Sequence, residues 1–133
     1  MKLGEVKGTL DGLLQIAGKN LPVKVSYAIA KNIKVLNEEF KTIEEQRIKL
    51  CEKYAKKDDI DKPITIEKNG NQVYQFDDND EQKVNEEYAE LLEEETKLDI
   101  HKVNIHEFEK CDQSDRYDIL NASEYSALEF MID

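Results

Sequence analysis

The sequence has no long apolar run and no apolar leader. No stretch of its 133 residues approaches the roughly 18 consecutive apolar residues that a membrane-spanning helix needs. The opening residues MKLGEVKGTL place glycines and charges where a signal peptide has its apolar core. These absences, together with the length, predict one domain over residues 1–133 that works in the cytoplasm without a membrane partner.

Cysteine is scarce, with only Cys51 and Cys111. In a reducing compartment, two cysteines this far apart in sequence are expected to be free thiols. His101, His106 and Cys111 follow one another at intervals of five. That interval matches neither the i, i+4 spacing of a helical metal site nor a C-x-x-C pair, so we expect no metal site.

Signatures of the common enzyme classes are also absent. The chain has no G-x-S-x-G motif, no phosphate-binding P-loop and no dinucleotide fingerprint. The acidic run from Asp77 to Glu81 resembles the start of a calcium loop. However, it lacks the glycine at position six, and Tyr88 stands where such a loop has its bidentate glutamate. The sequence therefore predicts a binding protein that is not an enzyme and has no cofactor.

Charge is unevenly distributed along the chain. The net charge is −11, with 30 acidic residues against 19 lysines and arginines. Residues 1–34 hold six lysines and two acidic residues, a sum of +4, so the remaining 99 residues carry −15. Such an acidic body repels nucleic acid and anionic membranes, so we expect no direct nucleic-acid partner. The N-terminal third could still hold an anion.

Two apolar seams predict a long antiparallel helical hairpin. The first predicts a helix over residues 22–57, and the second predicts its partner over residues 80–98. In this pairing Arg47 and Glu95 fall at facing seam positions, so we expect them to form a structural ion pair that fixes the register. The seam residues of the first helix are Ile29, Ile33, Leu36, Phe40, Ile43, Leu50 and Tyr54, and those of the second are Val84, Tyr88, Leu91 and Leu98.

A β-hairpin is predicted over residues 63–76, at the tip of the helical hairpin, with its turn at Asn69-Gly70. A two-residue loop would pair Ile66 with Val73. A three-residue loop would pair Ile66 with Tyr74 and gather the apolar side chains on one face, so burial favours the three-residue register. The predicted fold class is therefore mainly α with a β-hairpin.

The two ends of the chain are expected to add helices. Residues 1–19 have an amphipathic pattern interrupted by three glycines at intervals of four. Each glycine costs about 1 kcal/mol of helix propensity relative to alanine, which leaves either a weak helix or strand-turn segment or a glycine-lined packing or ligand surface. Residues 99–108 are expected to be extended and 110–120 to form a loop. A last helix is expected over residues 121–132.

A basic stripe is the candidate binding site. Lys24, Tyr27, Lys31 and Lys34 recur at steps of three and four, so they share one face at the start of the long helix. Lysines, a tyrosine and a helix N-terminus together favour an anionic ligand. The alternative is a solvated face that pairs with acidic residues of the second seam helix or of another subunit.

Three stretches carry a resemblance. They are LPVKVSYAIAKNIKVLNEEF (21–40), the hairpin-bearing insert after KYAKKD (53–58), and SEYSALEFMI (123–132). In this order they resemble an uncharacterised family of small proteins encoded by tailed phages and prophages of Gram-positive bacteria. The resemblance implies a phage origin and no known mechanism.

Small phage proteins of this kind act by stoichiometric binding, which leaves three hypotheses. The first is a counter-defence homo-oligomer that sequesters an anionic, nucleotide-type signal in pockets between its subunits. These pockets would be lined by Lys24, Tyr27, Lys31 and Lys34, with Arg116 and Tyr117. The second is an acidic inhibitor of a host defence or nucleic-acid-binding protein. The third is a virion assembly factor.

Overall fold

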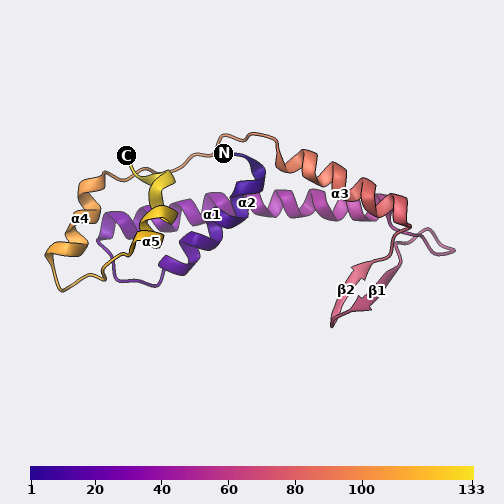
Figure 1. Ribbon diagram of the computed structural model, residues 1–133, viewed down its shortest axis with the longest axis horizontal. Coiled ribbons are helices and arrows are strands. Elements are labelled where there is room, and N and C mark those ends of the chain that lie inside the picture. Colours follow the sequence, from indigo (N-terminus) through magenta and orange to yellow (C-terminus); the bar gives the residue numbers. More distant parts are fainter.

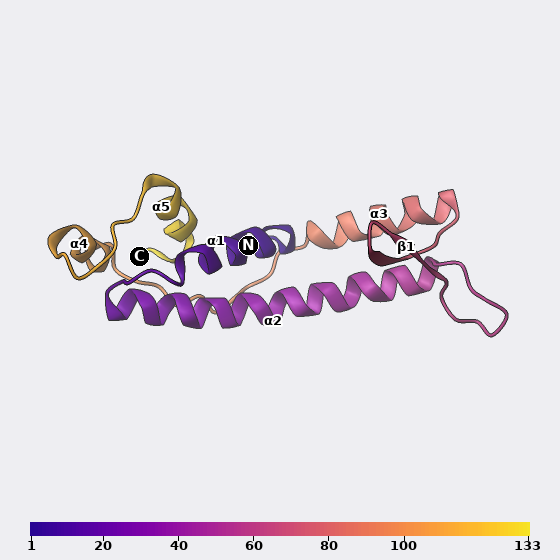
Figure 2. The same cartoon turned by 90° about the horizontal axis from the view of Figure 1, so that it is seen from below.

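The computed structural model describes all residues from 1 to 133 as a rod built on one long helix (Figure 1). This helix, α2, spans Val23–Tyr54 and is about 48 Å long at 1.5 Å per residue. Helices α1 (Leu3–Ile16) and α3 (Asp78–Leu92) lie end to end along one side of α2 and run antiparallel to it (Figure 2). The predicted class, mainly α with a β-hairpin on a helical hairpin, is confirmed.

The hydrophobic core lies at the N-terminal half of α2. There α1, α4 (Ile105–Gln113), α5 (Ala122–Leu128) and a short 3-10 helix (Glu129–Met131) surround it (Figure 1). The C-terminal half of α2 packs mainly against α3, so this part of the rod is thin. None of the five α-helices combines the length and the apolar composition that a bilayer span requires. The fully buried large side chains of the core include Val6, Leu13, Ile16, Val25, Leu36, Phe108, Leu128 and Met131.

The partner helix ends at Leu92, six residues earlier than residue 98 where the sequence predicted its end. The N-terminal residues occupy the place along α2 that a longer α3 would fill. Leu3 N–H donates to the Glu94 carbonyl at 2.9 Å, so the negative end of α3 meets the positive end of α1. A backbone hydrogen bond therefore links the C-terminal end of α3 to the N-terminal end of α1.

The predicted ion pair between Arg47 and Glu95 is wrong for the same reason. Because α3 stops before Glu95, this side chain pairs with the α-amino group of Met1 at 3.2 Å. Arg47 turns instead to Glu44 of its own helix, with 3.0 Å between Nη2 and Oε2. The register of the helical hairpin therefore does not depend on a charged seam pair.

Residues 3–16 form a helix despite their glycines, because that helix is tightly packed. A Cβ atom on Gly4 would lie 3.2 Å from the Leu92 carbonyl oxygen, and one on Gly12 would lie 3.2 Å from the Ala127 Cβ. Gly8 faces open space. Two of the three glycines thus allow close helix contacts, which offsets their cost in helix propensity.

The β-hairpin pairs β1 (Thr65–Lys68) with β2 (Asn71–Tyr74) in the two-residue register, so the predicted three-residue loop is wrong. Asn69 and Gly70 have φ angles of 54° and 81°, the left-handed values that a type I′ turn requires. Burial does not set the register because the strands are almost wholly exposed.

The C-terminal third is more helical than the sequence indicated. The extended segment ends at Asn104, whose side chain accepts a hydrogen bond from His106 N–H at 2.9 Å and caps α4. Helix α4 therefore occupies residues 105–113, where extended structure and loop were expected. The last helix has the expected cap at Asn121, but α5 ends at Leu128 and a 3-10 turn follows.

Candidate functional site

The N-terminus of α2 is a positively polarised end without a cap. No side chain caps it, and its first turn holds no acidic residue but does contain Lys24. Val25 and Ser26 donate to the Pro22 carbonyl at 3.0 Å, whereas the N–H groups of Val23 and Lys24 have no acceptor. Free N–H groups at a helix N-terminus attract negative charge, and a lysine beside them adds to this attraction.

This end opens into a groove between α2 and the extended segment 99–104. Its first pocket, of about 530 Å³, lies at the start of α2 and reaches Asn104, the cap of α4. Its second pocket, of about 350 Å³, continues along α2. The lining residues of the first are Val23, Lys24, Tyr27, His101, Lys102, Val103 and Asn104, and those of the second are Lys31, Lys34, Val35, Glu38, Asp99, Ile100, His101 and Lys102. Because His101 and Lys102 line both, we call the two together the α2 groove.

The wall of the α2 groove that faces α2 is the extended segment 99–104, and Asn32 holds this far wall in place. This fully buried side chain accepts from His101 N–H at 2.7 Å and donates to the His101 carbonyl at 3.0 Å. The His101 ring lies edge-on to the Tyr27 ring, with 5.3 Å between their centres. Val103 pairs with the chain end through a parallel bridge to Ile132. The wall is thus fixed through its backbone.

The lysines of the α2 groove have few partners. Lys24 Nζ is exposed and lies 3.5 Å from a carboxylate oxygen of the half-buried Glu107, and Lys31 Nζ lies over the Tyr27 ring at 5.9 Å. Lys34 makes no ion pair, and Lys102 donates to the Phe130 carbonyl. Exposed pairs of this kind contribute little stability, so the cations remain available to an anion.

The structure thus brings Lys24, Tyr27, Lys31 and Lys34 to one groove, but it places Arg116 and Tyr117 elsewhere. The Arg116 carbonyl accepts a hydrogen bond from the Asn20 side chain, in the turn between α1 and α2. Tyr117 is half-buried against the core. Neither residue lines the α2 groove.

Sequence reasoning missed the far wall of the α2 groove. His101, Lys102 and Asn104 come from a segment some 70 residues after the basic stripe in sequence. No periodic pattern linked the two, since extended chain has no helical face. The local signal was Asn104, a strong N-cap residue before an apolar-patterned stretch.

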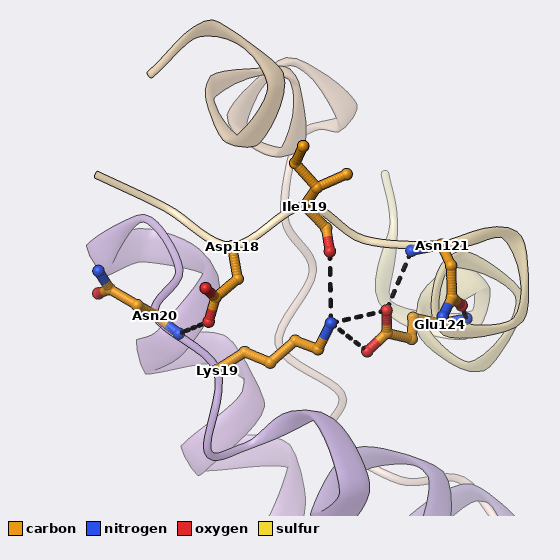
Figure 3. A network of polar contacts seen from close by, with 6 residues as sticks. All are labelled: Lys19, Asn20, Asp118, Ile119, Asn121 and Glu124. Atoms are coloured by element: carbon orange, nitrogen blue, oxygen red, sulfur yellow. Dashed lines mark hydrogen bonds and ion pairs between the residues drawn. The ribbon is translucent and has the colours of Figure 1, made fainter. Parts of the chain in front are cut away.

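A polar network positions the turn that leads into α2 (Figure 3). Lys19 Nζ pairs with the Glu124 carboxylate at 2.8 Å and donates to the Ile119 carbonyl at 3.3 Å. Asn20 N–H donates to an Asp118 carboxylate oxygen at 2.7 Å. The turn is thereby tied to the start of α5, and the α2 N-terminus is held beside α4.

Replacing Glu124 with glutamine is expected to make stability less sensitive to acid. The Asn121 backbone N–H, followed by Lys19, holds the pKa of the Glu124 carboxyl below its ordinary value of 4.5. A carboxyl with a lowered pKa stabilises the fold above its unfolded-state pKa and loses that contribution as pH falls through its folded-state pKa. Glutamine retains the acceptor of the capping box but does not titrate.

Thermal unfolding measured from about pH 6 down to about pH 3 tests this prediction. The melting temperature of the wild type should fall more steeply than that of Glu124→Gln, and the two curves should approach each other at low pH. Parallel curves over this range would show that Glu124 does not contribute to acid sensitivity.

The histidines and cysteines do not gather into a metal centre. His106 pairs with Glu109 at 3.3 Å, and no group of three or more His, Cys, Asp or Glu side chains is arranged to hold a metal ion. Cys51 and Cys111 are free and buried, and burial raises the pKa of both thiols. A buried thiol with a raised pKa is a poor nucleophile at neutral pH.

The α2 groove therefore brings lysine side chains, a tyrosine ring and the free N–H groups of a helix N-terminus to one surface. Comparison of the chain with protein-family models, with curated proteins and with solved structures finds no significant match. The resemblance to phage-encoded proteins stays a prediction.

Proposed function

We propose that this protein is a stoichiometric binder of an anionic, ring-bearing small molecule of the nucleotide type, and that the α2 groove holds it. The observation that carries the proposal is the uncapped N-terminus of α2, which opens into one pocket with Lys24 beside it and Tyr27 in its wall. Helix N-termini favour anions, and an exposed tyrosine ring offers a stacking surface.

The two pockets suit the two parts of such a ligand. The first has apolar side chains in Val23 and Val103 beside the Tyr27 ring, which suits a planar base. In the second, Lys31, Lys34 and Lys102 outnumber Glu38 and Asp99, which suits phosphate. Since one chain lines both pockets, each protomer would carry its own ligand.

The biological role that fits this proposal is counter-defence. A phage protein without catalytic groups can lower the concentration of a host signal only by holding it, one molecule per site. Tight stoichiometric binding within an oligomer would meet that need. Such a gene would be dispensable in hosts that lack the signalling system, whereas a virion assembly gene would be required in every host.

Reversing the charge of Lys24 and Lys31 is expected to weaken ligand binding at least tenfold. Lys24→Glu/Lys31→Glu removes two cations from the α2 groove and adds two anions that repel phosphate. The matched control is Lys41→Glu/Lys49→Glu, which makes the same charge change at exposed positions of α2 outside both pockets. Isothermal titration with a panel of mono-, di- and cyclic nucleotides measures the difference.

Substitutions of Tyr27, measured in the same assay, separate the contribution of ring stacking to ligand affinity from that of charge. Tyr27→Phe should bind as the wild type does, because the ring is retained, and Tyr27→Ala should bind several-fold more weakly. If no nucleotide in the panel binds, or if both charge-reversal variants lose affinity equally, the α2 groove is not the site.

A second function is favoured by a separate observation. Residues 77–95, which include α3, hold ten acidic residues and one lysine, and Val84 is the only buried residue of that helix. An exposed acidic helix of this kind suits a basic surface on a host protein. Capture of a basic protein from host lysate, released by moderate salt and abolished by charge reversal on α3, would favour this inhibitor role.

A further inference from the structure

The β-hairpin is the part of the molecule with the least support. It projects from the thin end of the rod, and no helix packs closely against it (Figure 1). Ile66 and Val73, paired across the strands, are 43% and 36% exposed. A lone two-stranded hairpin is only marginally stable in water, so an added strand would stabilise it considerably.

The register identifies which backbone groups of the hairpin are unpaired. Gln75 N–H donates to the Ile64 carbonyl at 2.9 Å, so Ile64 and Gln75 are a hydrogen-bonded pair. Hydrogen-bonded and non-hydrogen-bonded pairs alternate along an antiparallel ladder. The backbone groups of Thr65 and Glu67 therefore point outward from β1, and those of Gln72 and Tyr74 point outward from β2.

The two edges have different surroundings. A notch between the hairpin and α2 is lined by Gln72 and Tyr74 of β2 and also by Ile66 and Lys68 of β1. Only β2 adds a hydrogen bond to the rod, from the Tyr74 hydroxyl to Glu52 at 3.3 Å. Thr65 and Glu67 line none of the main pockets, and their outward backbone groups have no partner. The edge of β1 is the one open to another strand.

We propose that the edge of β1 is the interface with a second copy of this chain, and that two β1 strands pair antiparallel about a two-fold axis through Ile66. Thr65 of each copy then exchanges backbone hydrogen bonds with Glu67 of the other. Val73, Ile66 and their two symmetry mates line one face of the four-stranded sheet. Apolar cross-strand pairs of this kind stabilise sheets.

Charge supports a second copy as the occupant. Each chain carries −11, yet residues 63–76 contain one acidic and one basic residue, Glu67 and Lys68. The hairpin is thus a neutral surface on a strongly acidic molecule, and the proposed axis sets Glu67 opposite Thr65 rather than opposite its own mate. Outside the hairpin, two copies repel each other because each carries a net charge of −11. Salt screens this repulsion, so association should strengthen as salt is raised.

The formation of an intermolecular disulfide tests directly whether the two-fold axis passes through Ile66. Residues facing each other in a non-hydrogen-bonded pair are close enough for a disulfide, so Ile66→Cys should form a covalent dimer with oxidised glutathione. In the matched control, Val73→Cys, the two sulfurs would be separated by about 14 Å, three strand spacings, and should stay reduced. The native cysteines are buried and should not contribute. A covalent dimer of Val73→Cys alone would assign the interface to β2 and overturn the proposal.

Proline variants test pairing along the edge of β1 without introducing a cysteine. Proline is tolerated where a strand N–H points outward, so Glu67→Pro should keep the hairpin but block pairing along β1, and Gln72→Pro perturbs the other edge equally. Light scattering after gel filtration should give twice the 15.5 kDa chain mass for the wild type and Gln72→Pro, and 15.5 kDa for Glu67→Pro. A wild type that stays monomeric in high salt at about 1 mM, or a dimeric Glu67→Pro, contradicts the proposal.

Discussion

Replacing Asn32 with leucine is expected to lower the free energy of unfolding by about 2–4 kcal/mol, although leucine fits the helix and is more apolar. Asn32 donates to the carbonyl of His101 and accepts from its N–H, and leucine can do neither. Each lost hydrogen bond removes about 1 kcal/mol, and a partly buried backbone group left without a partner costs about 1–3 kcal/mol more. The loss therefore exceeds any gain from the added apolar surface.

Urea unfolding followed by circular dichroism measures this change. The matched control is Asn37→Leu, at an exposed position of α2, which should change stability by less than about 0.5 kcal/mol. The two variants share the same chemical change, so their difference measures the buried contacts of Asn32, which are those with the His101 backbone and with the Met131 sulfur. A stability of Asn32→Leu close to that of Asn37→Leu would mean that segment 99–104 is held by other contacts.

The same substitution should also affect the α2 groove. Without Asn32, the backbone of His101 is released from α2, and the ring no longer has a fixed position against Tyr27. Ligand affinity should fall even in conditions where the protein remains folded. A variant that is destabilised but binds as tightly as the wild type would separate the stability of the segment from the function proposed for it.

Asn32 also shows how much of the site could be predicted from sequence. It lies three residues after Ile29 and four before Leu36, on the apolar face of a helix whose seam was visible. A polar residue at such a position is a sign of a specific buried contact. The sequence contained this signal, but it could not identify the partner, because the partner is backbone of a segment without periodicity.

The long helix and its hairpin partner were predictable because their information is local and repeated. The predicted helix over 22–57 differs from α2 by one residue at its start and three at its end. The end of α3 was not predictable, because the apolar seam continues to Leu98 while the helix stops at Leu92. The place on α2 that a longer α3 would cover is occupied by α1, which is far away from α3 in sequence.

In the hairpin, by contrast, the local turn signal was correct, and the prediction was wrong because it gave more weight to the burial of apolar side chains. Asn69-Gly70 is a strong signal for a type I′ turn, and the structure has that turn. The three-residue register was preferred for its burial of apolar side chains, but the hairpin is exposed and such burial does not occur. Turn chemistry is decisive where a strand has no core to face.

Replacing Phe108 with alanine is expected to have the largest effect on stability of any change discussed, about 3–5 kcal/mol. Phe108 is only 1% exposed and packs against Tyr125, with 6.3 Å between the ring centres. Helix α4 has nine residues, too few to be stable alone, so it depends on the side chains that it buries. Alanine removes the main one of these buried side chains and leaves a cavity in its place.

The unfolding should begin locally at α4 and reach the α2 groove. Hydrogen exchange of residues 104–113 should accelerate more than that of α1, because α1 keeps its contacts with α2. The matched control is His106→Ala on the same helix, whose exposed side chain pairs only with Glu109 at the surface, and it should unfold as the wild type does. Since Asn104, the cap of α4, lines the first pocket, Phe108→Ala should also weaken ligand binding before the rod itself unfolds. If exchange instead rises equally throughout the chain, α4 unfolds only together with the core, and the α2 groove is as stable as the long helix that forms its floor.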